Sequence, residues 1–186
     1  MHRLFVAIRP PQAVRERLLA LMGGISGARW QTDEQLHLTL RFIGEVDRHR
    51  ARDIDAALSA IHHPGFALSL DGLGCFDRGG EPATLWVGVS PIDPVKALHR
   101  KIDQAIARIG LEADRRAYSP HITLARLGRG AGPIAQVLET RGGFSSDPFQ
   151  VDNFTLFESR LTPEGAVHTP LERYPLDRAS PTHGTE

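Results

Sequence analysis

One short pattern with chemically active side chains occurs twice in the sequence. Residues 37–40 (His-Leu-Thr-Leu) and 121–124 (His-Ile-Thr-Leu) both lie in stretches that have the character of a β-strand. Residues two apart on a strand point to the same face, so each copy presents an imidazole and a hydroxyl on one face and two aliphatic side chains on the other. The sequence therefore predicts two similar strands that each offer a histidine and a threonine to a common site.

Two histidines beside two hydroxyl groups suit acid–base displacement at phosphorus. One imidazole takes a proton from water while the other, protonated, gives a proton to the departing oxygen, and the ordinary histidine pKa of about 6.5 lets both forms exist at neutral pH. The hydroxyls of Thr39 and Thr123 would donate hydrogen bonds to phosphoryl oxygens as charge redistributes. This chemistry requires no metal, and it predicts that His37 and His121 face each other at the floor of a cleft between two lobes.

Other interpretations of the pattern have to be weighed. A single copy is a weak signal, since threonine and leucine are common in strands and a buried histidine is often only hydrogen-bonded. The second copy, with the same face pattern, favours catalysis. Two histidines are also possible metal ligands. Neither copy has a His-x-x-x-His partner or an acidic residue at ligand spacing, so a metal site is disfavoured.

The elements that would position the pattern are strands mixed with helices. Periodicity predicts strands over residues 4–8, 36–43, 66–76, 85–89, 121–125, 149–157 and 167–176, and helices over 11–22, 47–61 and 93–109, with a short helical turn over 134–138. Asp93 is the expected N-cap of the third helix, with Pro94 at its first position. Strand pairs separated by turns favour an α+β fold with largely antiparallel sheets. Residues 1–176 form one predicted domain of two lobes, followed by a polar, flexible tail over 177–186.

Composition and charge limit the class of protein. The 186 residues include 22 basic and 22 acidic side chains, so the formal net charge is zero, which argues against binding nucleic acid through bulk charge alone. The hydrophobic content of 41% is that of a globular domain. The single cysteine, Cys75, excludes an internal disulfide and a cysteine-based zinc site. Apolar runs are too short for a signal peptide or a membrane span, so we expect a cytoplasmic protein with no membrane contact.

Four segments resemble one known family. They are residues 3–8 (Arg-Leu-Phe-Val-Ala-Ile), 37–44 (His-Leu-Thr-Leu-Arg-Phe-Ile-Gly), 118–126 (Tyr-Ser-Pro-His-Ile-Thr-Leu-Ala-Arg) and 154–159 (Phe-Thr-Leu-Phe-Glu-Ser). Together with the paired His-x-Thr pattern, they are similar to the two-histidine phosphoesterase superfamily. Within it they resemble the RNA 2′,3′-cyclic phosphodiesterase branch, also known as the 2′-5′ RNA ligase branch. The segments occur in the order of that branch along nearly the whole chain.

The resemblance implies a fold, an activity and a set of site residues. The fold would be bilobal and α+β, with two largely antiparallel sheets flanked by helices around a central cleft. The activity would be hydrolysis of RNA 2′,3′-cyclic phosphate ends to 2′-phosphates, with a weaker, reversible 2′-5′ ligation in some members. His37 would be the general acid toward the leaving O3′ and His121 the general base for water, while Thr39 and Thr123 bind the substrate. No cofactor is implied, the partner is the RNA end itself, and we expect a monomer.

Three further side chains are candidates for substrate binding. Arg41 lies on the expected face of the first histidine, and a guanidinium matches the geometry of a phosphate. Arg126 points away from the second histidine if that strand alternates regularly, but the resemblance implies a phosphate-binding role for it. Tyr118 is a candidate for stacking on a nucleobase. His168 stands where relatives often have an aromatic residue, and we expect no role for it.

Two alternatives stay open at this point. An enzyme with the same site could act on 2′-5′-linked oligonucleotides or on a small cyclic nucleotide. A module that does not catalyse could use the histidines only to recognise an RNA end or a nucleotide. The presence of both histidines and both threonines favours catalysis, since a binding module need not keep both pairs.

Overall fold

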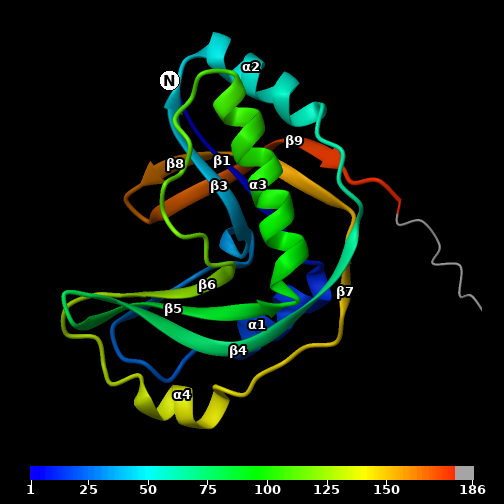
Figure 1. The fold of residues 1–186 in the computed structure, drawn as a ribbon. Coiled ribbons are helices and arrows are strands. Elements are labelled where there is room, and N and C mark those ends of the chain that lie inside the picture. Colours follow the sequence, from blue (N-terminus) through cyan, green and yellow to red (C-terminus); the bar gives the residue numbers. More distant parts are fainter. Residues whose placement is uncertain (179–186) are drawn as a thin grey trace, which may run out of the picture.

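The computed structural model describes residues 1–178, which contain nine strands and four helices (Figure 1). The strands are β1 (His2–Ile8), β2 (Ala28–Trp30), β3 (Leu38–Val46), β4 (Phe66–Arg78), β5 (Glu81–Ser90), β6 (His121–Leu127), β7 (Phe149–Val151), β8 (Asn153–Thr162) and β9 (Gly165–Pro175). The helices are α1 (Gln12–Ala20), α2 (Arg48–Ser59), α3 (Ile92–Arg108) and α4 (Ala135–Arg141), and a 3-10 turn, η1 (Asp33–Gln35), precedes β3.

The strands form one antiparallel path that divides into two lobes. Its order is β7-β4-β5-β6-β3-β1-β8-β9, with β2 paired to β6. Where the lobes join, β3 and β6 pair at a single position, Leu38 opposite Ile122. Figure 1 shows β4, β5 and β6 in the lower lobe and β1, β3, β8 and β9 in the upper lobe. The predicted α+β class with antiparallel strands in two lobes is confirmed, and the two sheets are continuous through that one pair.

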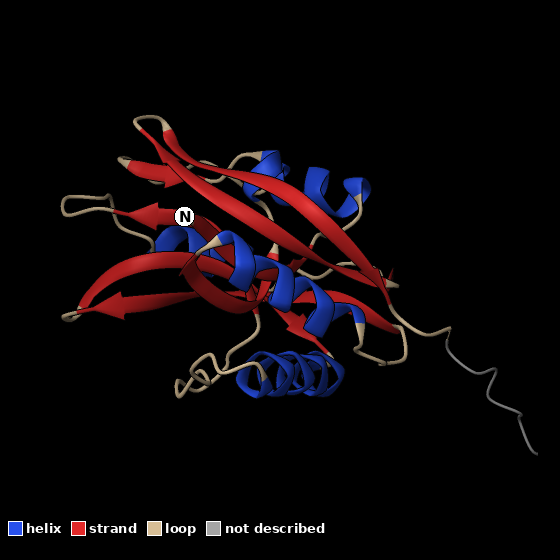
Figure 2. Cartoon of the chain, turned by 90° about the horizontal axis from the view of Figure 1, so that it is seen from above, coloured by secondary structure: helices blue, strands red, loops and turns tan. Residues whose placement is uncertain are grey.

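One apolar core extends under both lobes and receives the helices. The inward stripe of α3 has the three- and four-residue spacing of an amphipathic helix, and all of its members are buried: Val95, Leu98, Ile102 and Ile106. This helix packs beside α2 and β3, and Figure 2 shows helices on more than one side of the twisted strands. Within residues 1–178, no helix is long and apolar enough to cross a membrane.

Several element boundaries differ from the sequence predictions for local reasons. Helix α3 begins at Ile92 with Pro91 as its N-cap, so Asp93 lies in its first turn and is not the cap. The strand predicted over 36–43 begins at Leu38, because the capped turn η1 occupies the residues before it. The strand predicted over 149–157 is divided into β7 and β8, which pair with different lobes. Strand β2 has no counterpart in the sequence prediction.

The residue after the predicted domain, Asp177, forms backbone hydrogen bonds with the segment before β4. The amide of Asp177 donates a hydrogen bond to the carbonyl of His63, and the carbonyl of Asp177 accepts one from the amide of Gly65, both at 2.9 Å. Asp177, the first residue of the predicted tail, is thus hydrogen-bonded to the segment before β4, and the tail over 177–186 stays a prediction. Residues 179–186 of that tail lie outside the residues that the structure describes.

Candidate active site

The two His-x-Thr copies meet at the pair that joins the lobes. Leu38 and Ile122 are opposite each other and almost fully buried, so the residues on either side of them in each strand turn to the other face. Those residues are His37, Thr39, His121 and Thr123. Because the strands are antiparallel, the copies run in opposite directions, and each histidine lies beside the threonine of the other copy. We define the surface made by these four residues as the site face.

His121 is held by its backbone surroundings and by aromatic rings. Its Nδ1–H donates a hydrogen bond to the carbonyl of Ser119 at 2.7 Å, which leaves the lone pair of the neutral ring on Nε2. The ring of Phe76 meets it edge-on at 4.8 Å, and Trp86 lies at 6.2 Å. Burial lowers the pKa of His121 more than the Ser119 hydrogen bond raises it, so the imidazole is neutral at physiological pH.

His37 lies in a more enclosed and more apolar setting. Its ring is 4.8 Å from Phe5, 6.3 Å from Phe157 and 5.2 Å from His168. Burial is the largest cause of its pKa falling to about 3, followed by the charge of the neighbouring His168, while a hydrogen bond with the backbone of Gln35 opposes the shift. The first histidine is therefore also neutral when no substrate is bound.

A β-bulge brings Arg126 to the site face. Along β6, Thr123 is opposite Trp86 and Arg126 is opposite Thr84, so Leu124 is an extra residue that shifts the alternation by one. The guanidinium then reaches Thr84, whose hydroxyl accepts a hydrogen bond at 3.3 Å. Its positive charge helps to lower the pKa values of both histidines. The regular alternation that would turn Arg126 away from His121 does not occur.

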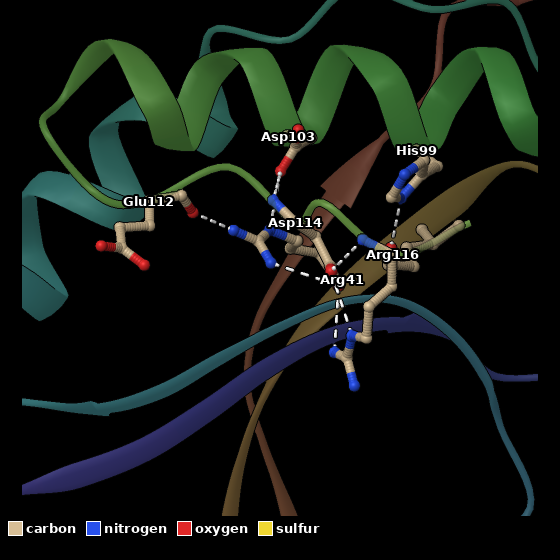
Figure 3. A network of polar contacts seen from close by, with 7 residues as sticks. Arg41, His99, Asp103, Glu112, Asp114 and Arg116 are labelled. Atoms are coloured by element: carbon tan, nitrogen blue, oxygen red, sulfur yellow. Dashed lines mark hydrogen bonds and ion pairs between the residues drawn. The ribbon is translucent and has the colours of Figure 1, made fainter. Parts of the chain in front are cut away.

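A second bulge turns Arg41 away from the site face. Ala7 is opposite Thr39 and Val6 is opposite Arg41, so Leu40 is the extra residue in β3. The prediction that Arg41 shares a face with His37 and Thr39 is therefore wrong. The buried guanidinium pairs with Asp103 at 2.9 Å and Asp114 at 3.5 Å. Figure 3 shows Asp103 reaching it from α3, and Glu112, whose carbonyl accepts from it, lying with Asp114 in the segment after that helix.

Tyr118 is a tether in this structure and not an open platform for a nucleobase, contrary to the sequence prediction. Its hydroxyl donates to the carbonyl of Thr39 at 2.9 Å, and its ring stacks on His99 with centroids 3.9 Å apart. His99 in turn donates from Nδ1 to the carbonyl of Leu40 at 2.7 Å. Burial raises the pKa of Tyr118, so the phenol stays protonated. These contacts tie the segment before His121 to the strand after His37.

The structure adds His168, for which the sequence predicted no role. In the hairpin of β8 and β9, His168 is opposite Ser159. Ser159 shares a face of β8 with Phe157, two residues before it, so His168 lies on the same face as Phe157. Its ring meets Phe5 at 4.9 Å and His37 at 5.2 Å, both edge-on. Its Nδ1 is buried and has no hydrogen-bond partner within residues 1–178. Its place depends on the register of this hairpin, which no pattern along the sequence gives.

The site thus combines two neutral imidazoles, two threonines and one guanidinium around a junction of two similar strands. A hydrogen bond to the Ser119 carbonyl orients the ring of His121, and the ring of Phe5 packs beside His37. Arg126 supplies positive charge and has no carboxylate partner within residues 1–178. This is the arrangement that acid–base displacement at a phosphate requires.

Comparison with known proteins identifies the family to which the chain belongs. The family model of the 2′-5′ RNA ligase superfamily matches residues 9–162. An RNA 2′,3′-cyclic phosphodiesterase of Archaeoglobus fulgidus is 30% identical over 172 residues, which cover 91% of this chain and 97% of its own. The enzyme of the same name from Escherichia coli is 32% identical over 178 residues, with 94% and 96% covered. The chain belongs to the 2′-5′ RNA ligase superfamily.

Solved structures agree with the fold. A protein of Thermus thermophilus superposes with a TM-score of 0.79 at 26% identity, covering 93% of this chain and 97% of its own. Escherichia coli LigT in its apo form gives a TM-score of 0.75 at 28% identity, covering 94% and 97%. LigT has also been solved with 3′-AMP and with phosphate.

Proposed function

We propose that this protein hydrolyses RNA 2′,3′-cyclic phosphate ends to 2′-phosphates. The observation that carries the proposal is the pairing at Leu38 and Ile122, which sets two His-x-Thr copies on one face in opposite directions. A pair of imidazoles related in this way can act on opposite sides of one phosphorus. The name carried by the relatives, RNA 2′,3′-cyclic phosphodiesterase, supplies the substrate.

The reaction is a displacement of O3′ by water. His121 Nε2 accepts a proton from water as the water oxygen bonds to phosphorus, and the P–O3′ bond breaks. His37 donates a proton to O3′, so a 3′-hydroxyl and a 2′-phosphate result, and the proton on His121 is later exchanged with solvent to restore the enzyme. Thr39 and Thr123 donate to the non-bridging oxygens, where Arg126 adds positive charge.

This mechanism requires a neutral His121 and a protonated His37 before the reaction begins. A neutral His121 is ready to serve as a base, which fits its lowered pKa. His37 has a pKa of about 3 without substrate, so it must gain its proton together with the phosphate. The anion beside it favours the imidazolium, since a nearby opposite charge stabilises the charged form. Substrate binding and protonation of the acid are thus coupled.

The proposal also includes a second reaction and bears on the alternative functions. A reversible 2′-5′ ligation is proposed as a minor activity. In that reaction the 5′-hydroxyl of a second RNA attacks phosphorus in place of water, it gives its proton to His121, and His37 again protonates the departing O3′. The 2′-5′ oligonucleotides, small cyclic nucleotides and pure end-binding considered above as alternatives are not favoured by the names of the relatives. A monomer in the cytoplasm stays a prediction, to be checked by sedimentation and cell fractionation.

The direct test is hydrolysis of a short RNA that ends in a 2′,3′-cyclic phosphate, in buffer containing EDTA. We expect conversion to the 2′-phosphate, with the phosphate position read by phosphorus NMR. His121→Ala and His37→Ala should each abolish turnover while the His121→Ala protein still binds the RNA end. His49→Ala, an exposed histidine on α2, is the matched control and should keep full activity.

Other outcomes would redirect the assignment. Turnover only after addition of metal would contradict the metal-free mechanism. A 3′-phosphate product would place the acid at O2′ instead of O3′. Binding of the RNA end with no turnover in the wild-type protein would leave the end-binding module as the better description.

A further inference from the structure

Two arginines face each other across paired strands beside the site. In the pairing of β2 with β6, Arg29 is directly opposite Arg126, and Arg126 is in turn opposite Thr84 on β5. Residues directly opposite in an antiparallel pair project from the same face, so Arg29 extends the row from Thr84 through Arg126 by one strand. Adjacent strands lie about 4.8 Å apart, which puts a second guanidinium next to the one that serves the cyclic phosphate.

These two like charges are not paired with a carboxylate in the part of the chain that the structure describes. Both arginines are exposed, and within residues 1–178 neither forms an ion pair with a carboxylate. The next positions on the same face are Gly27 and Gly128, which carry no charge. Like charges directly opposite on paired strands are destabilising, so the fold tolerates a cost here that an anion would remove.

Space for a ligand lies beside the pair. A Cβ added at Gly128 would meet no heavy atom within 4 Å, so the surface next to Arg126 is open. The same holds at Gly130 in the loop that follows β6. On the Arg29 side, the backbone of Gly130 and Ala131 lies within 4 Å of a Cβ added at Gly27, so the open side for a polynucleotide backbone is the one next to Gly128.

We propose that Arg29 binds the phosphodiester on the 5′ side of the terminal nucleotide. The inference rests on the proposed function, in which the cyclic phosphate occupies the two histidines and Arg126. The substrate continues from that nucleotide only through its 5′ oxygen, so the next anion along the chain is the 5′ phosphodiester. An adjacent guanidinium is the group suited to bind it.

The consequence is a preference for oligonucleotides over mononucleotides. A nucleoside 2′,3′-cyclic phosphate with a free 5′-hydroxyl has one phosphate and leaves Arg29 without a ligand. A dinucleotide that ends in a cyclic phosphate occupies both arginines. The site therefore selects the end of an RNA chain over a free cyclic nucleotide.

The experiment measures kcat and KM for adenosine 2′,3′-cyclic phosphate and for a dinucleotide ending in a 2′,3′-cyclic phosphate. Arg29→Ala should raise KM for the dinucleotide about tenfold, the usual effect of losing one charge-assisted hydrogen bond, and leave both constants for the mononucleotide unchanged. The slope of log KM against log salt for the dinucleotide should fall by about 0.7, as expected for one lost phosphate contact on a single strand. Arg29→Lys should recover part of the loss.

Controls separate this inference from the proposed function. Arg52→Ala removes an exposed arginine on α2 and should change neither substrate. If the wild-type protein hydrolyses neither substrate, the proposed function itself fails. If it hydrolyses both and Arg29→Ala affects them equally, or affects neither, the subsite is ruled out while the proposed function stands.

Discussion

At the scale of single residues, the surroundings of His37 decide when it carries a charge. Phe5 and Phe157 enclose the ring, and His168 adds a second imidazole at its edge. In the unfolded chain the same histidine titrates near its ordinary pKa of about 6.5. Folding therefore favours release of its proton, which links the stability of the protein to pH.

The first prediction follows from the sign of that shift. Because the folded pKa of His37 is lowered to about 3, the unfolded state binds the extra proton below pH 6.5, and stability is lost as the pH falls from there toward 3. His37→Gln removes this contribution. The free energy of unfolding of the wild type should fall relative to the variant by up to about 2 kcal/mol between pH 7 and pH 5, measured by urea unfolding.

Other histidines with lowered pKa values act in both proteins and cancel in the difference. They are His63, His121 and His168, and burial is the first cause of each shift. A difference in stability that does not change between pH 7 and pH 5 would mean that His37 titrates normally in the folded protein.

The second prediction concerns His168. Its buried Nδ1 has no partner within residues 1–178, and an unsatisfied buried polar atom costs free energy. His168→Phe keeps an aromatic ring against Phe5 and His37 but removes that atom. The free energy of unfolding at pH 7.5 should rise by about 1 kcal/mol in urea titration. A loss of stability would show that the nitrogen is satisfied in solution, and His168→Asn, which restores a polar group, should not give the gain.

At the scale of elements, two bulges decide which arginine serves the site. Leu124 is the extra residue in β6 and Leu40 the extra residue in β3. Each follows the threonine of its His-x-Thr copy. After the bulge, β6 presents Arg126 to the site, whereas β3 turns Arg41 toward α3. One arginine therefore faces the site, and the other pairs with carboxylates of the protein itself.

The segment from Gly110 to Pro120 connects α3 to the strand that carries His121. Arg41 holds it through Asp114 and the carbonyl of Glu112, and Arg116 adds a second ion pair to Asp114 at 3.1 Å. The side-chain hydrogen bond from Arg116 is the largest cause of the Asp114 pKa falling to about 2. Because β3 and β6 pair at one position only within residues 1–178, these contacts help to set the position of the second histidine relative to the first.

The third prediction is that Arg41 is a positioning residue. Arg41→Ala leaves the Asp103 carboxylate without its cation, while Arg116 still pairs with Asp114, and should lower the free energy of unfolding by about 2 kcal/mol. The loosened segment should lower kcat about tenfold with a smaller change in KM, because the catalytic group is displaced rather than the binding group removed. Amide hydrogen exchange over residues 110–120 should become faster. Arg41→Lys should recover part of kcat.

The matched control is Arg141→Ala. Arg141 lies on α4, and its Nη1 donates to the carbonyls of Leu21 and Gly23 at 2.6 and 3.2 Å. This variant should lose stability while kcat is kept. If both variants lower kcat equally, the effect of Arg41 is general loss of structure and not positioning.

At the scale of the whole molecule, few backbone hydrogen bonds join the two lobes, but both lobes contribute to one hydrophobic core. The core cluster includes Leu4 of β1, Leu85 of β5 and Val95 of α3, so it is shared by both lobes and by the helix between them. A shared core argues for folding as a single cooperative unit despite the single strand pair at the junction.

The fourth prediction tests that unit. The two tryptophans of the chain, Trp30 and Trp86, both lie in the lower lobe, so their fluorescence follows that lobe, while far-UV circular dichroism follows both. Urea transitions measured by the two signals should have the same midpoint and slope. A second transition seen by circular dichroism alone would mean that the upper lobe unfolds by itself, and would divide residues 1–176 into two domains.

The sequence alone determined the class of fold and the face that each histidine of the candidate site shares with its threonine. The face that His37 shares with Thr39, and His121 with Thr123, depends only on the two-residue repeat of a strand, which is a local property of the chain. The same holds for the buried stripe of α3. These features were predictable because each is set by residues next to one another in sequence.

The tertiary structure decided which side chains from different strands lie next to one another. Arg126 enters the site and Arg41 leaves it because of one extra residue in each strand, and bulges appear only when a strand is paired with its neighbours. His168 reaches His37 through the register of the β8–β9 hairpin, and Arg29 reaches Arg126 through the unpredicted β2. Cross-strand register depends on contacts between residues far apart in sequence, and a period counted along the chain carries no information about it.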